Sequence, residues 1–436
     1  MTLWTQDAEP GHPYWWDGIA WAETHDALPE KCDLLIIGAG YTGLSAALAA
    51  HDCGASIVVV DAGDPGKGAS TRNGGMFGAH PRLGWSTLAR QFGAEVADAL
   101  FDEASSALDW AKDLIAREDI ICDLQQTGRI QLAWTAKHFK NQNALAQTLA
   151  DKSRVRAHVV AREDLAQEIA TERYYGGIVF DEHCGIHPAK FHQGLMRAVL
   201  ARGIPVIAEC PVTGVERRGS TFAAATSRGR ITAQKVLLAT NGYTTDTFAW
   251  HARRVFALPS YIIATEPLAA NLIGHLAPGR RMMVETRARH SYFRISPDGT
   301  RILFGGRASM VNVDPHVAAR RLRATMCEVW PELKGTRISH SWRGNTGYSF
   351  THMPHVGEDR GLHHAMGYSG SGTVMAPYLG AKAAYQAMGD ARGQTGYSQT
   401  DLARHWMHPG TRPHFLHAAN LWYRTAVDWT ENLKSR

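Results

Sequence analysis

Three glycines near the start of the chain have the spacing of a turn that binds phosphate groups. Gly38, Gly40 and Gly43 form the pattern G-x-G-x-x-G in "GAGYTG", between an apolar strand-like stretch and a helical stretch of small residues. The first glycine permits a tight turn, the second lets the backbone approach a pyrophosphate, and the third lets helix and strand pack closely. The helix N-terminus adds free N–H groups and the positive end of a dipole. The turn, which includes Tyr41 and Thr42, therefore predicts a dinucleotide site.

An acidic residue closes the next apolar stretch, "SIVVVDAG". Asp61, followed by Ala62, stands at the distance along the chain at which a carboxylate binds the ribose hydroxyls of a dinucleotide. A carboxylate at this place disfavours the 2′-phosphate of NADP. The turn and the aspartate fit FAD and NAD equally, so the choice between them depends on other residues.

The stretch that follows, "GKGASTRNGGMFG" at 66–78, is too rich in glycine and small polar residues for regular structure. A polar, glycine-rich loop directly after the second strand can follow a pyrophosphate toward a flavin ring, with backbone N–H groups and one guanidinium as donors. This loop favours FAD. The residues predicted to contact the cofactor here are Ala69, Ser70, Thr71, Arg72, Asn73, Gly74, Gly75 and Met76.

A second glycine-rich turn, "GYSGSGTVMAP", precedes another predicted helix late in the chain. A flavin ring that accepts a hydride gathers negative charge at its N1–O2 edge, and a helix N-terminus with free N–H groups can stabilise that charge. Pro377 is tolerated near the start of such a helix. We expect the early turn to bind the phosphate end of FAD and this turn to bind its redox end. The residues predicted to contact the ring are Gly370, Gly372, Thr373 and Val374. A plain helix after a loop is the alternative.

The elements that position these turns alternate between strand and helix in the first part of the chain. Residues 32–40, 41–54 and 56–63 form one β-α-β unit, because two apolar strands flank a helix of small residues. Residues 87–113 and 135–151 have helical periodicity. This alternation indicates an α/β domain.

Later segments contain more strands. A helix is expected from Pro188 to Gly203, four short strands within 204–243, and a hairpin around Pro-Asp-Gly in 291–307. The apolar stripe of a terminal helix at 415–429, which includes Trp429, is expected to dock on the protein's own core.

The predicted fold class is α/β, with a Rossmann-like FAD-binding domain and an inserted substrate domain of mostly antiparallel β-sheet plus helices. The predicted segments are an N-terminal extension at 1–29, FAD-binding segments at 30–86, 161–250 and 339–395, substrate segments at 87–160 and 251–338, and a C-terminal helical tail at 396–436.

Composition limits the class of protein. The 436 residues are 44% hydrophobic and 20% charged, which is typical of a globular chain long enough for two domains. No apolar run approaches the roughly 18 residues of a membrane span, and the N-terminus lacks the pattern of a signal peptide. Six cysteines without CxxC spacing suit a reducing cytoplasm. The net charge of +5 without a Lys/Arg block predicts no nucleic-acid partner, although an RNA-associated flavoprotein remains an alternative from a different class.

The loop "ASTRNGG" resembles the S-x-R-N-G-G loop of the FAD-dependent D-amino acid oxidase superfamily, in particular its γ-glutamylputrescine oxidase-like branch. The resemblance covers about residues 30 to 390. It continues through "GIHPAKFHQGLMRA", "VLLATNGYT", "SYIIATEPL", "DGTRILFGGR" and "GYSGSGTVMAPYLG".

The resemblance implies further cofactor contacts. Val212 would pair its backbone with the adenine edge, and the adenosine side would be lined by Thr240, Asn241 and Gly242. "VLLATNG" read by itself is equally a buried strand with its turn.

The mode of FAD binding also follows from the resemblance. Asn73 stands about where some relatives carry a histidine linked to the flavin, so FAD is predicted to bind tightly but noncovalently. His80 is the residue that could make this prediction wrong. Ser371 stands where related sequences often carry histidine, which leaves the contact to the ring at that position open.

The implied reaction is oxidation of a C–N bond of an amine or amino acid by hydride transfer to flavin N5. The product would be an imine that hydrolyses to an aldehyde or keto compound. The candidate substrates are γ-glutamylated polyamines, N-methyl amino acids and other small amino compounds with an anionic group. An NAD-dependent dehydrogenase is a competing interpretation, but it leaves the loop and the late turn unexplained.

Such a reaction needs anchors for the substrate more than an acid–base triad. Strand alternation in "HSYFRIS" places Tyr292 and Arg294 on one face. Arg294 could bind a carboxylate through two parallel hydrogen bonds or take part in a structural salt bridge. Arg343 and Tyr348 in "WRGNTGYSF" are further substrate-binding candidates.

The catalytic candidates are Tyr261, Arg294 and Ser371. Tyr261 lies on a strand that passes near the flavin in this superfamily, and some sarcosine-oxidising relatives place a lysine on that strand to activate oxygen. The absence of lysine from "LPSYIIATEPL" leaves open whether oxygen is the electron acceptor. No metal site is predicted, because "HCGIH" at 183–187 is a loop leading into the Pro188 helix.

Overall fold

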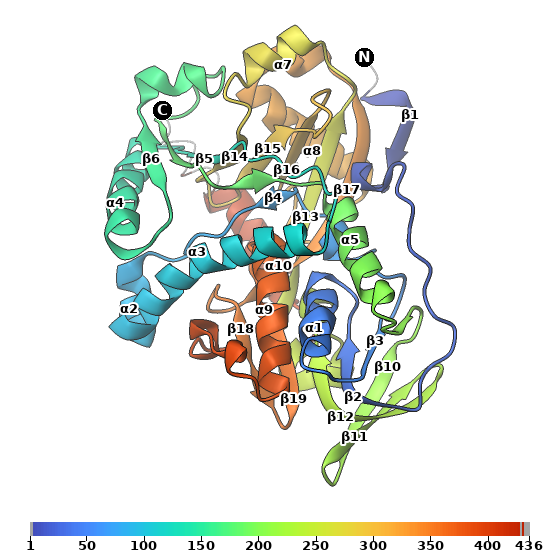
Figure 1. Cartoon of the computed structure of the whole chain (residues 1–436). Helices are drawn as coiled ribbons and strands as arrows, with labels where there is room; N and C mark the ends of the chain where they lie inside the picture. The colour runs from blue at the N-terminus through green and yellow to red at the C-terminus, as the bar shows by residue number, and fades with distance from the viewer. Residues whose placement is uncertain (1–2, 428–429, 431–436) are drawn as a thin grey trace.

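Two β-sheets form the two halves of the molecule in the computed structural model, which describes residues 3–427 and residue 430 (Figure 1). The lower half in this view contains β2, β3, β12 and β19, and the upper half contains the sheet around β15, β16 and β17. The two halves meet where Tyr348, at the end of β17, pairs with Tyr368 in the glycine-rich turn before α9.

The first sheet has five parallel strands at its centre, in the order β19-β12-β2-β3-β9. Two antiparallel strands extend it beyond β12, and β18 pairs with β19. The bounds are β2 (Lys31–Ile37), β3 (Ile57–Val60), β9 (Val206–Ile207), β10 (Val212–Arg218), β11 (Thr221–Thr226), β12 (Gly229–Leu238), β18 (His355–Asp359) and β19 (Leu362–Met366). This parallel centre is the Rossmann-like part of the fold.

Both faces of the parallel strands are buried, which explains their continuous apolar sequences. In β2, Leu34 and Ile36 pack into the core on the helix side, and Leu35 and Ile37 pack into the core on the opposite side. The helix side is covered by α1 (Tyr41–His51), α5 (Pro188–Ala201), α9 (Gly372–Ala387) and the long α3 (Ala94–Arg117).

The second sheet has the order β1-β17-β13-β16-β15-β14-β5-β7-β6 and is mostly antiparallel. Its parallel pairs are β1 with β17 and β14 with β5. The bounds are β1 (Trp4–Pro10), β5 (Arg129–Leu132), β6 (Ala157–Val160), β7 (Gly177–Phe180), β13 (Val255–Thr265), β14 (Met282–Glu285), β15 (Ser291–Ile295), β16 (Ile302–Gly306) and β17 (Ile338–Ser349).

Shorter elements complete the fold. The remaining helices are α2 (Trp85–Phe92), α4 (Ala136–Lys152), α6 (Ala249–Ala252), α7 (Ala270–Leu276), α8 (Pro315–Val329) and α10 (Phe415–Trp422). The loop at 66–78 contains one short 3-10 turn, Ala69–Thr71, and ends in the two-residue strand β4 (Met76–Phe77), which pairs with β8 (Cys184–Gly185).

Local patterns in the sequence predicted these elements well. The β-α-β unit, the helix from Pro188, the four strands β9 to β12 and the β15–β16 hairpin are all present. The mixed α/β fold class is confirmed as well.

The sheets correct the predicted segment boundaries at four elements. β1, β7 and β17 all pair within the second sheet, although they fall in the predicted N-terminal extension and in FAD-binding segments. α3 falls in a predicted substrate segment but packs into the core beside α1 and α9. The positions of these four elements depend on strand pairing and helix packing between segments far apart in the sequence. Local periodicity carries no information about such contacts.

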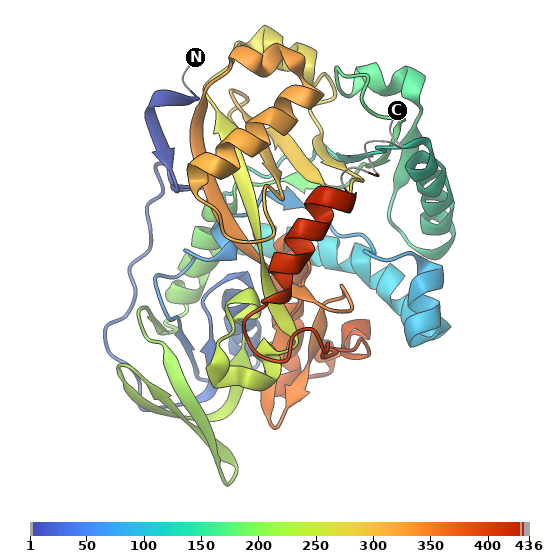
Figure 2. The same cartoon turned by 180° about the vertical axis from the view of Figure 1, so that it is seen from behind.

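The C-terminal tail docks on the back of the molecule, where Figure 2 shows α10 in red. Leu416 is buried against Leu258 and Tyr348, and Asn420 Oδ1 accepts a hydrogen bond of 3.0 Å from the Met310 N–H. The expected docking therefore holds for the first turns of the helix. Leu421 and Trp422 are 65% and 63% exposed, and Trp429 lies outside the described residues.

We expect Gly380→Ala to destabilise the folded protein by about 1–3 kcal/mol, because overpacking forces the backbone to shift. A Cβ atom on Gly380 in α9 would lie 2.3 Å from the Thr42 carbonyl oxygen of α1. Gly274→Ala in α7 is the matched control. No atom lies within 4 Å of the corresponding Cβ position, so alanine should stabilise by about 0.5–1 kcal/mol there. Chemical denaturation measures the free energy of unfolding of both variants. If Gly380→Ala is as stable as Gly274→Ala, the close packing of α1 on α9 is contradicted.

Candidate active site

Both glycine turns line one cavity of about 500 Å³. Gly38 and Gly40 come from the turn before α1, and Gly370 and Gly372 come from the turn before α9. The other predicted cofactor residues that line this cavity are Tyr41, Thr42, Asp61, Ala62, Ala69, Ser70, Asn73, Val212, Thr240, Asn241 and Thr373. The structure therefore brings together residues from five separate parts of the sequence.

The early turn fits a phosphate group because side chains are absent where the backbone comes close. Gly38 has φ +109°, and a Cβ atom there would lie 3.0 Å from the Ala239 carbonyl oxygen. A Cβ on Gly40 would lie 2.9 Å from Ser70 Oγ, which also accepts a hydrogen bond of 3.0 Å from the Tyr41 N–H. The N-terminus of α1 thus borders the cavity, with Ser70 on its first N–H, and the glycines leave space for a pyrophosphate beside it.

Asp61 lies at the end of β3 on the wall of the same cavity. Its carboxylate accepts hydrogen bonds from the Ala39 N–H at 2.7 Å and the Gly63 N–H at 3.1 Å. Burial raises the pKa of Asp61, although the backbone donors oppose that rise. A carboxylate has about four lone-pair sites, so two backbone donors leave room for ribose hydroxyls.

The loop at 66–78 is held by the N-terminal segment. Trp15 Nε1–H donates to the Asn73 carbonyl oxygen at 2.8 Å, and Trp16 Nε1–H donates to Thr71 Oγ1 at 2.8 Å. The Lys67 ammonium lies 3.5 Å from the centre of the Trp21 ring. Sequence reasoning missed this support, and the adjacent tryptophans in "PYWWDG" were its only signal.

Five predicted cofactor residues do not line the cavities and instead shape them. Gly43 packs helix on strand, Thr71 is fully buried and donates to the Gly66 carbonyl, and the Gly75 carbonyl accepts from Arg294. The other two are Gly242, where a Cβ would lie 3.0 Å from Gly347 Cα, and the fully buried Val374.

Asn241 connects the end of β12 to the late turn. Its φ is +44°, a conformation that asparagine tolerates better than most residues, and its Oδ1 accepts a hydrogen bond of 2.9 Å from the Gly367 N–H. The late turn itself needs left-handed backbone at Gly367 and at Gly370, whose φ values are +79° and +104°. Asn241 therefore fixes the position of this turn as well as lining the cavity.

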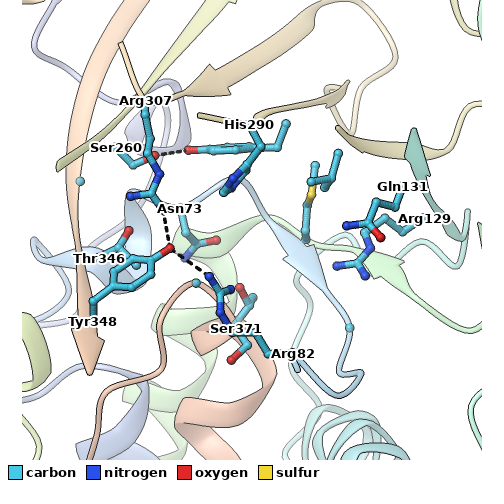
Figure 3. Close-up of a pocket in the computed structure, with 18 of the residues that line it drawn as sticks. Asn73, Arg82, Arg129, Gln131, Ser260, His290, Arg307, Thr346, Tyr348 and Ser371 are labelled. Carbon is cyan, nitrogen blue, oxygen red and sulfur yellow. Dashed lines mark hydrogen bonds between the residues drawn. The ribbon is translucent and has the colours of Figure 1, made fainter. Parts of the chain in front are cut away.

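A second cavity of about 590 Å³ adjoins the first (Figure 3). The residues that line both cavities are Ala69, Asn73, Asn345, Thr346, Gly370 and Thr373. Three predicted cofactor residues line the second cavity and not the first, namely Arg72, Gly74 and Met76. The cavities meet at the late turn, where sequence analysis placed the redox end of the cofactor.

Arginine dominates the charge of the second cavity. Among the described residues that line it are five arginines, Arg72, Arg82, Arg129, Arg287 and Arg307, and a single carboxylate, Glu285. The lining histidines His80, His290 and His352 have lowered pKa values, caused first by burial and then by nearby arginines. Burial thus keeps these imidazoles neutral at pH 7, and the cavity is strongly electropositive.

Tyr348 lies between two of these arginines (Figure 3). Arg82 Nη2 donates to the phenol oxygen at 3.4 Å, and Arg307 Nη2 donates to the same oxygen. Burial alone would raise the pKa of Tyr348, but the charges and hydrogen bonds of Arg307 and Arg82 outweigh it and lower the pKa. A Cβ on Gly370 would lie 3.6 Å from this oxygen, so the phenol is adjacent to the late turn.

Tyr292 lines another wall of the cavity, whereas Arg294, predicted to share its face of the strand, does not line it. The Tyr292 hydroxyl is 2.8 Å from Ser260 Oγ, and its ring lies close to two glycines, Gly74 and Gly305. Burial raises the pKa of Tyr292 to about 12, so this phenol is neutral at pH 7.

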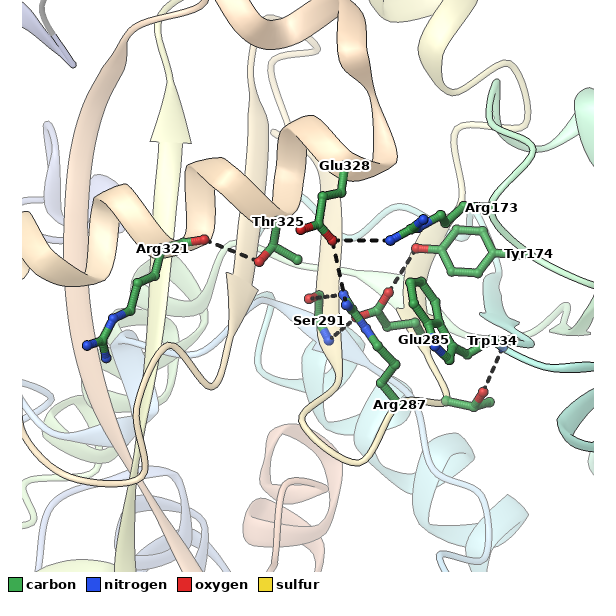
Figure 4. Close-up of polar contacts among 10 residues, drawn as sticks. Trp134, Arg173, Tyr174, Glu285, Arg287, Ser291, Arg321, Thr325 and Glu328 are labelled. Atoms are coloured by element: carbon green, nitrogen blue, oxygen red, sulfur yellow. Dashed lines mark hydrogen bonds and ion pairs between the residues drawn. The ribbon is translucent and has the colours of Figure 1, made fainter. Parts of the chain in front are cut away.

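Glu285 is neutralised within the protein, as Figure 4 shows. It is 1% exposed, forms an ion pair with Arg287, and accepts hydrogen bonds of 2.9 Å from the Tyr174 hydroxyl and the Ser291 N–H. Arg287 also lies 4.0 Å from Glu328. The carboxylate of this cavity is therefore not available to a ligand cation.

Three residues predicted to bind substrate or to act in catalysis, Arg294, Tyr261 and Arg343, do not line the arginine-rich cavity. Arg294 is 5% exposed and donates to three backbone carbonyls, those of Gly75, Ile186 and Ile295, so it supports the loop instead of binding substrate. The Tyr261 hydroxyl donates to the Val311 carbonyl at 3.0 Å and accepts from the Val313 N–H.

Tyr261 and Arg343 pair across β13 and β17 and line a separate cavity of about 430 Å³. Their strand neighbours Ser260 and Gly344 line the arginine-rich cavity instead. Successive residues of a strand point to opposite faces, so a shift of one position decided which cavity each side chain reached. Ser371 does line the arginine-rich cavity, where its Oγ–H donates to the Tyr368 carbonyl at 2.8 Å.

The arginines that sequence reasoning missed had weak signals. Arg307 ends the quoted stretch "DGTRILFGGR", and Arg82 follows the glycine-rich loop by a few residues. Arg129 and Gln131 alternate with the buried Ile130 and Leu132 in β5, which places them on the cavity side. Only the pairing of β5 with β14 brings that side to the site.

Comparison with known proteins identifies the family. Residues 33–386 match the family model described as "DAO: FAD dependent oxidoreductase". "Probable oxidoreductase OrdL" of Rhizobium meliloti (strain 1021) is 30% identical over 393 residues, which cover 88% of this chain and 90% of the relative. "Gamma-glutamylputrescine oxidoreductase" of Escherichia coli (strain K12) is 27% identical, with 89% of this chain and 90% of the relative covered.

Solved structures share the fold. Glycine oxidase from Geobacillus kaustophilus aligns with a TM-score of 0.70 at 17% identity, over 86% of this chain and 100% of that chain. The protein belongs to the DAO family of FAD-dependent oxidoreductases, and the resemblance inferred from the sequence motifs is confirmed. No helix in the described part of the chain is long and apolar enough to cross a membrane.

We expect Trp15→Phe to weaken FAD retention about two- to tenfold, because it removes one buried hydrogen bond worth about 0.5–1.5 kcal/mol. The ring still packs, but the Asn73 carbonyl loses its donor. Trp21→Phe is the control, since the Trp21 N–H makes no hydrogen bond within the described residues. FAD release followed by flavin fluorescence measures the effect. Equal release from both variants would show that the hydrogen bond to the loop does not matter.

Proposed function

We propose that this protein oxidises a small amine or amino acid that carries an anionic group, with FAD bound tightly but noncovalently. The observation that carries the proposal is the meeting of two cavities at the late glycine turn, one lined by dinucleotide-binding residues and one lined by arginines. An anionic substrate in the second cavity would lie beside the redox end of the cofactor in the first.

The residues present fit FAD. The turn before α1 would hold the pyrophosphate, Asp61 the ribose, and the N-terminus of α9 the ring. Bound FAD would accept a hydride from the carbon next to the substrate nitrogen, which leaves an imine for hydrolysis. Noncovalent binding is supported by Asn73, whose Nδ2–H₂ donates to the Ser70 carbonyl at 2.9 Å and which offers no nucleophile.

Tyr348 is placed to control the proton of the substrate. An amine must lose its ammonium proton before its carbon can release a hydride. Arg82 and Arg307 stabilise the phenolate form of Tyr348, because both donate to its oxygen. The same oxygen borders the late turn, so it can accept the ammonium proton next to the reacting carbon.

Arg82 and Arg307 also supply the anchor for the substrate anion. Neither guanidinium forms an ion pair with an Asp or Glu of the described chain, and both line the cavity. A carboxylate would find two cations with free donors there, which favours an amino acid or a γ-glutamyl compound over a plain amine. A γ-glutamylated amine is the second candidate, since the E. coli relative bears that substrate in its name.

The electron acceptor and the compartment belong to the same proposal. Oxygen is a candidate acceptor, but no lysine is found among the described residues that line the arginine-rich cavity. The six cysteines are all free thiols, which supports a reducing cytoplasmic location.

An anaerobic visible spectrum of the purified protein tests the proposal. We expect flavin bands that bleach on addition of amino acids or γ-glutamyl amines and persist with uncharged amines. Readmitted air then shows whether oxygen restores the bands. A yellow protein that no amine or amino acid bleaches would refute the proposed reaction.

We expect kcat/KM to rise with pH through the lowered pKa of Tyr348 and to level off once the phenolate has formed. In Tyr348→Phe the rise of kcat/KM should shift to higher pH, to the pKa of the free substrate amine. The charged or titratable groups that contact the phenol are Arg82, Arg307 and His352, and burial keeps His352 neutral. Tyr292→Phe is the matched control, whose pH limb should stay in place because burial already holds that phenol neutral. An unchanged limb in Tyr348→Phe would exclude Tyr348 as the proton acceptor.

A further inference from the structure

Arg129 lies at the far side of the arginine-rich cavity from Tyr348. In Figure 3, Arg129 and Gln131 are grouped on one side, and Arg82, Arg307 and Tyr348 are grouped on the other. Both members of the first group come from β5, where they alternate with core residues. The cavity therefore has two separate polar ends.

The Arg129 guanidinium has no negative partner among the residues that the structure describes. Its Nη2 lies 3.0 Å and 3.1 Å from the two ring nitrogens of His80, its carbon lies 4.8 Å from the centre of the Phe180 ring, and its Nε is buried without a hydrogen bond. No Asp or Glu of the described residues forms an ion pair with it. Burial lowers the pKa of Arg129 to about 10, so the group is still cationic at pH 7.

The surroundings of Arg129 cannot supply the missing charge. His80 and His183 have pKa values held well below the usual range, first by burial and then by Arg129 itself, so both are neutral. The carboxylate of Glu285 is bound by Arg287. A buried cation without a counter-charge is costly, and native proteins normally pair it.

Gln131 offers a second free group at the same end. Its side-chain amide lines the cavity and makes no hydrogen bond within the described part of the chain, whereas its backbone carbonyl accepts from Gln142. A guanidinium with an unused N–H next to a free amide matches the two oxygens of a carboxylate.

We propose that Arg129 and Gln131 form a second anion subsite, so that the cavity takes an amine or amino acid with two carboxylates. One carboxylate would bind at Arg82 and Arg307, and the other at Arg129 and Gln131. The identification of this ligand as a substrate rests on the proposed function, but the subsite itself does not.

Binding of non-oxidisable acids to the FAD-loaded protein tests the subsite without turnover. The probes are succinate, glutarate and adipate, each compared with the monocarboxylate of equal chain length, and the readout is perturbation of the flavin absorption bands. We expect one dicarboxylate to bind at least tenfold more tightly than its monocarboxylate partner. Equal affinities across all three pairs would overturn the proposal.

Variants assign the preference to Arg129. Arg129→Met should remove the preference by weakening the dicarboxylate at least tenfold, with the monocarboxylate unchanged within about twofold. Arg129→Lys should keep part of the preference, because it retains the charge, and Gln131→Leu should lose part of it. Arg156→Met, at an exposed arginine on the surface, is the control. The proposal fails if Arg129→Met weakens the dicarboxylate and the monocarboxylate equally. It also fails if Arg129→Met does not fold while Arg129→Lys and Gln131→Leu both bind the acids as wild type does. In either case Arg129 has a structural role only.

Turnover separates this inference from the proposed function. Amines with one carboxylate that are oxidised as efficiently as those with two would refute the second subsite and leave the proposed function intact. A dicarboxylate preference that depends on Arg129, in a protein that no amine reduces, would support the subsite and refute the proposed reaction.

Discussion

Direct packing of α1 on α9 is the constraint on which the site depends. The two helices touch backbone to backbone at Gly380, and a hydrogen bond of 2.8 Å between Thr42 Oγ1 and the Tyr368 hydroxyl joins the first turn of α1 to the turn before α9. Ser45 Oγ–H also donates to the Pro377 carbonyl at 2.7 Å, which ties α1 to α9 through a second side chain. Because the helices start at the same end, two sets of free N–H groups face one cavity, and a long anionic cofactor can use both.

The positive charge of the arginine-rich cavity depends on a second constraint. The other ionisable side chains there are either paired within the protein or kept neutral. Glu285 is bound by Arg287, and burial keeps the neighbouring histidines neutral. The remaining arginines of the cavity form no ion pair with an Asp or Glu of the described residues. Such buried charges are unfavourable by themselves, and an anion in the cavity would relieve that cost.

Sequence patterns predicted the parts of this molecule that depend on neighbours along the chain. Glycine spacing in Gly38–Gly43, apolar strands and the polar loop predicted residues that share one cavity. The substrate end was harder because its residues come together only through pairing between distant strands. Arg294 and Arg129 both lie on strands, but backbone carbonyls of Gly75 and Ile186 occupy the first, whereas the second lines the arginine-rich cavity. Domain boundaries were missed for the same reason, since β1, β7 and β17 are assigned by their partners.

The pairing of β1 with β17 also determines the order in which the protein can be completed during synthesis. Trp4 lies opposite Ile338 and Glu9 lies opposite His340, so β1 finds its partner only after β17, which begins at Ile338, has been made. Trp15 and Trp16 follow β1 directly, and they hold the loop that surrounds the cofactor. Such non-local pairing is slow to form, because a long intervening chain must first be ordered. The cofactor loop thus acquires its final support late, and a nascent chain carries the loop without that support for most of its translation.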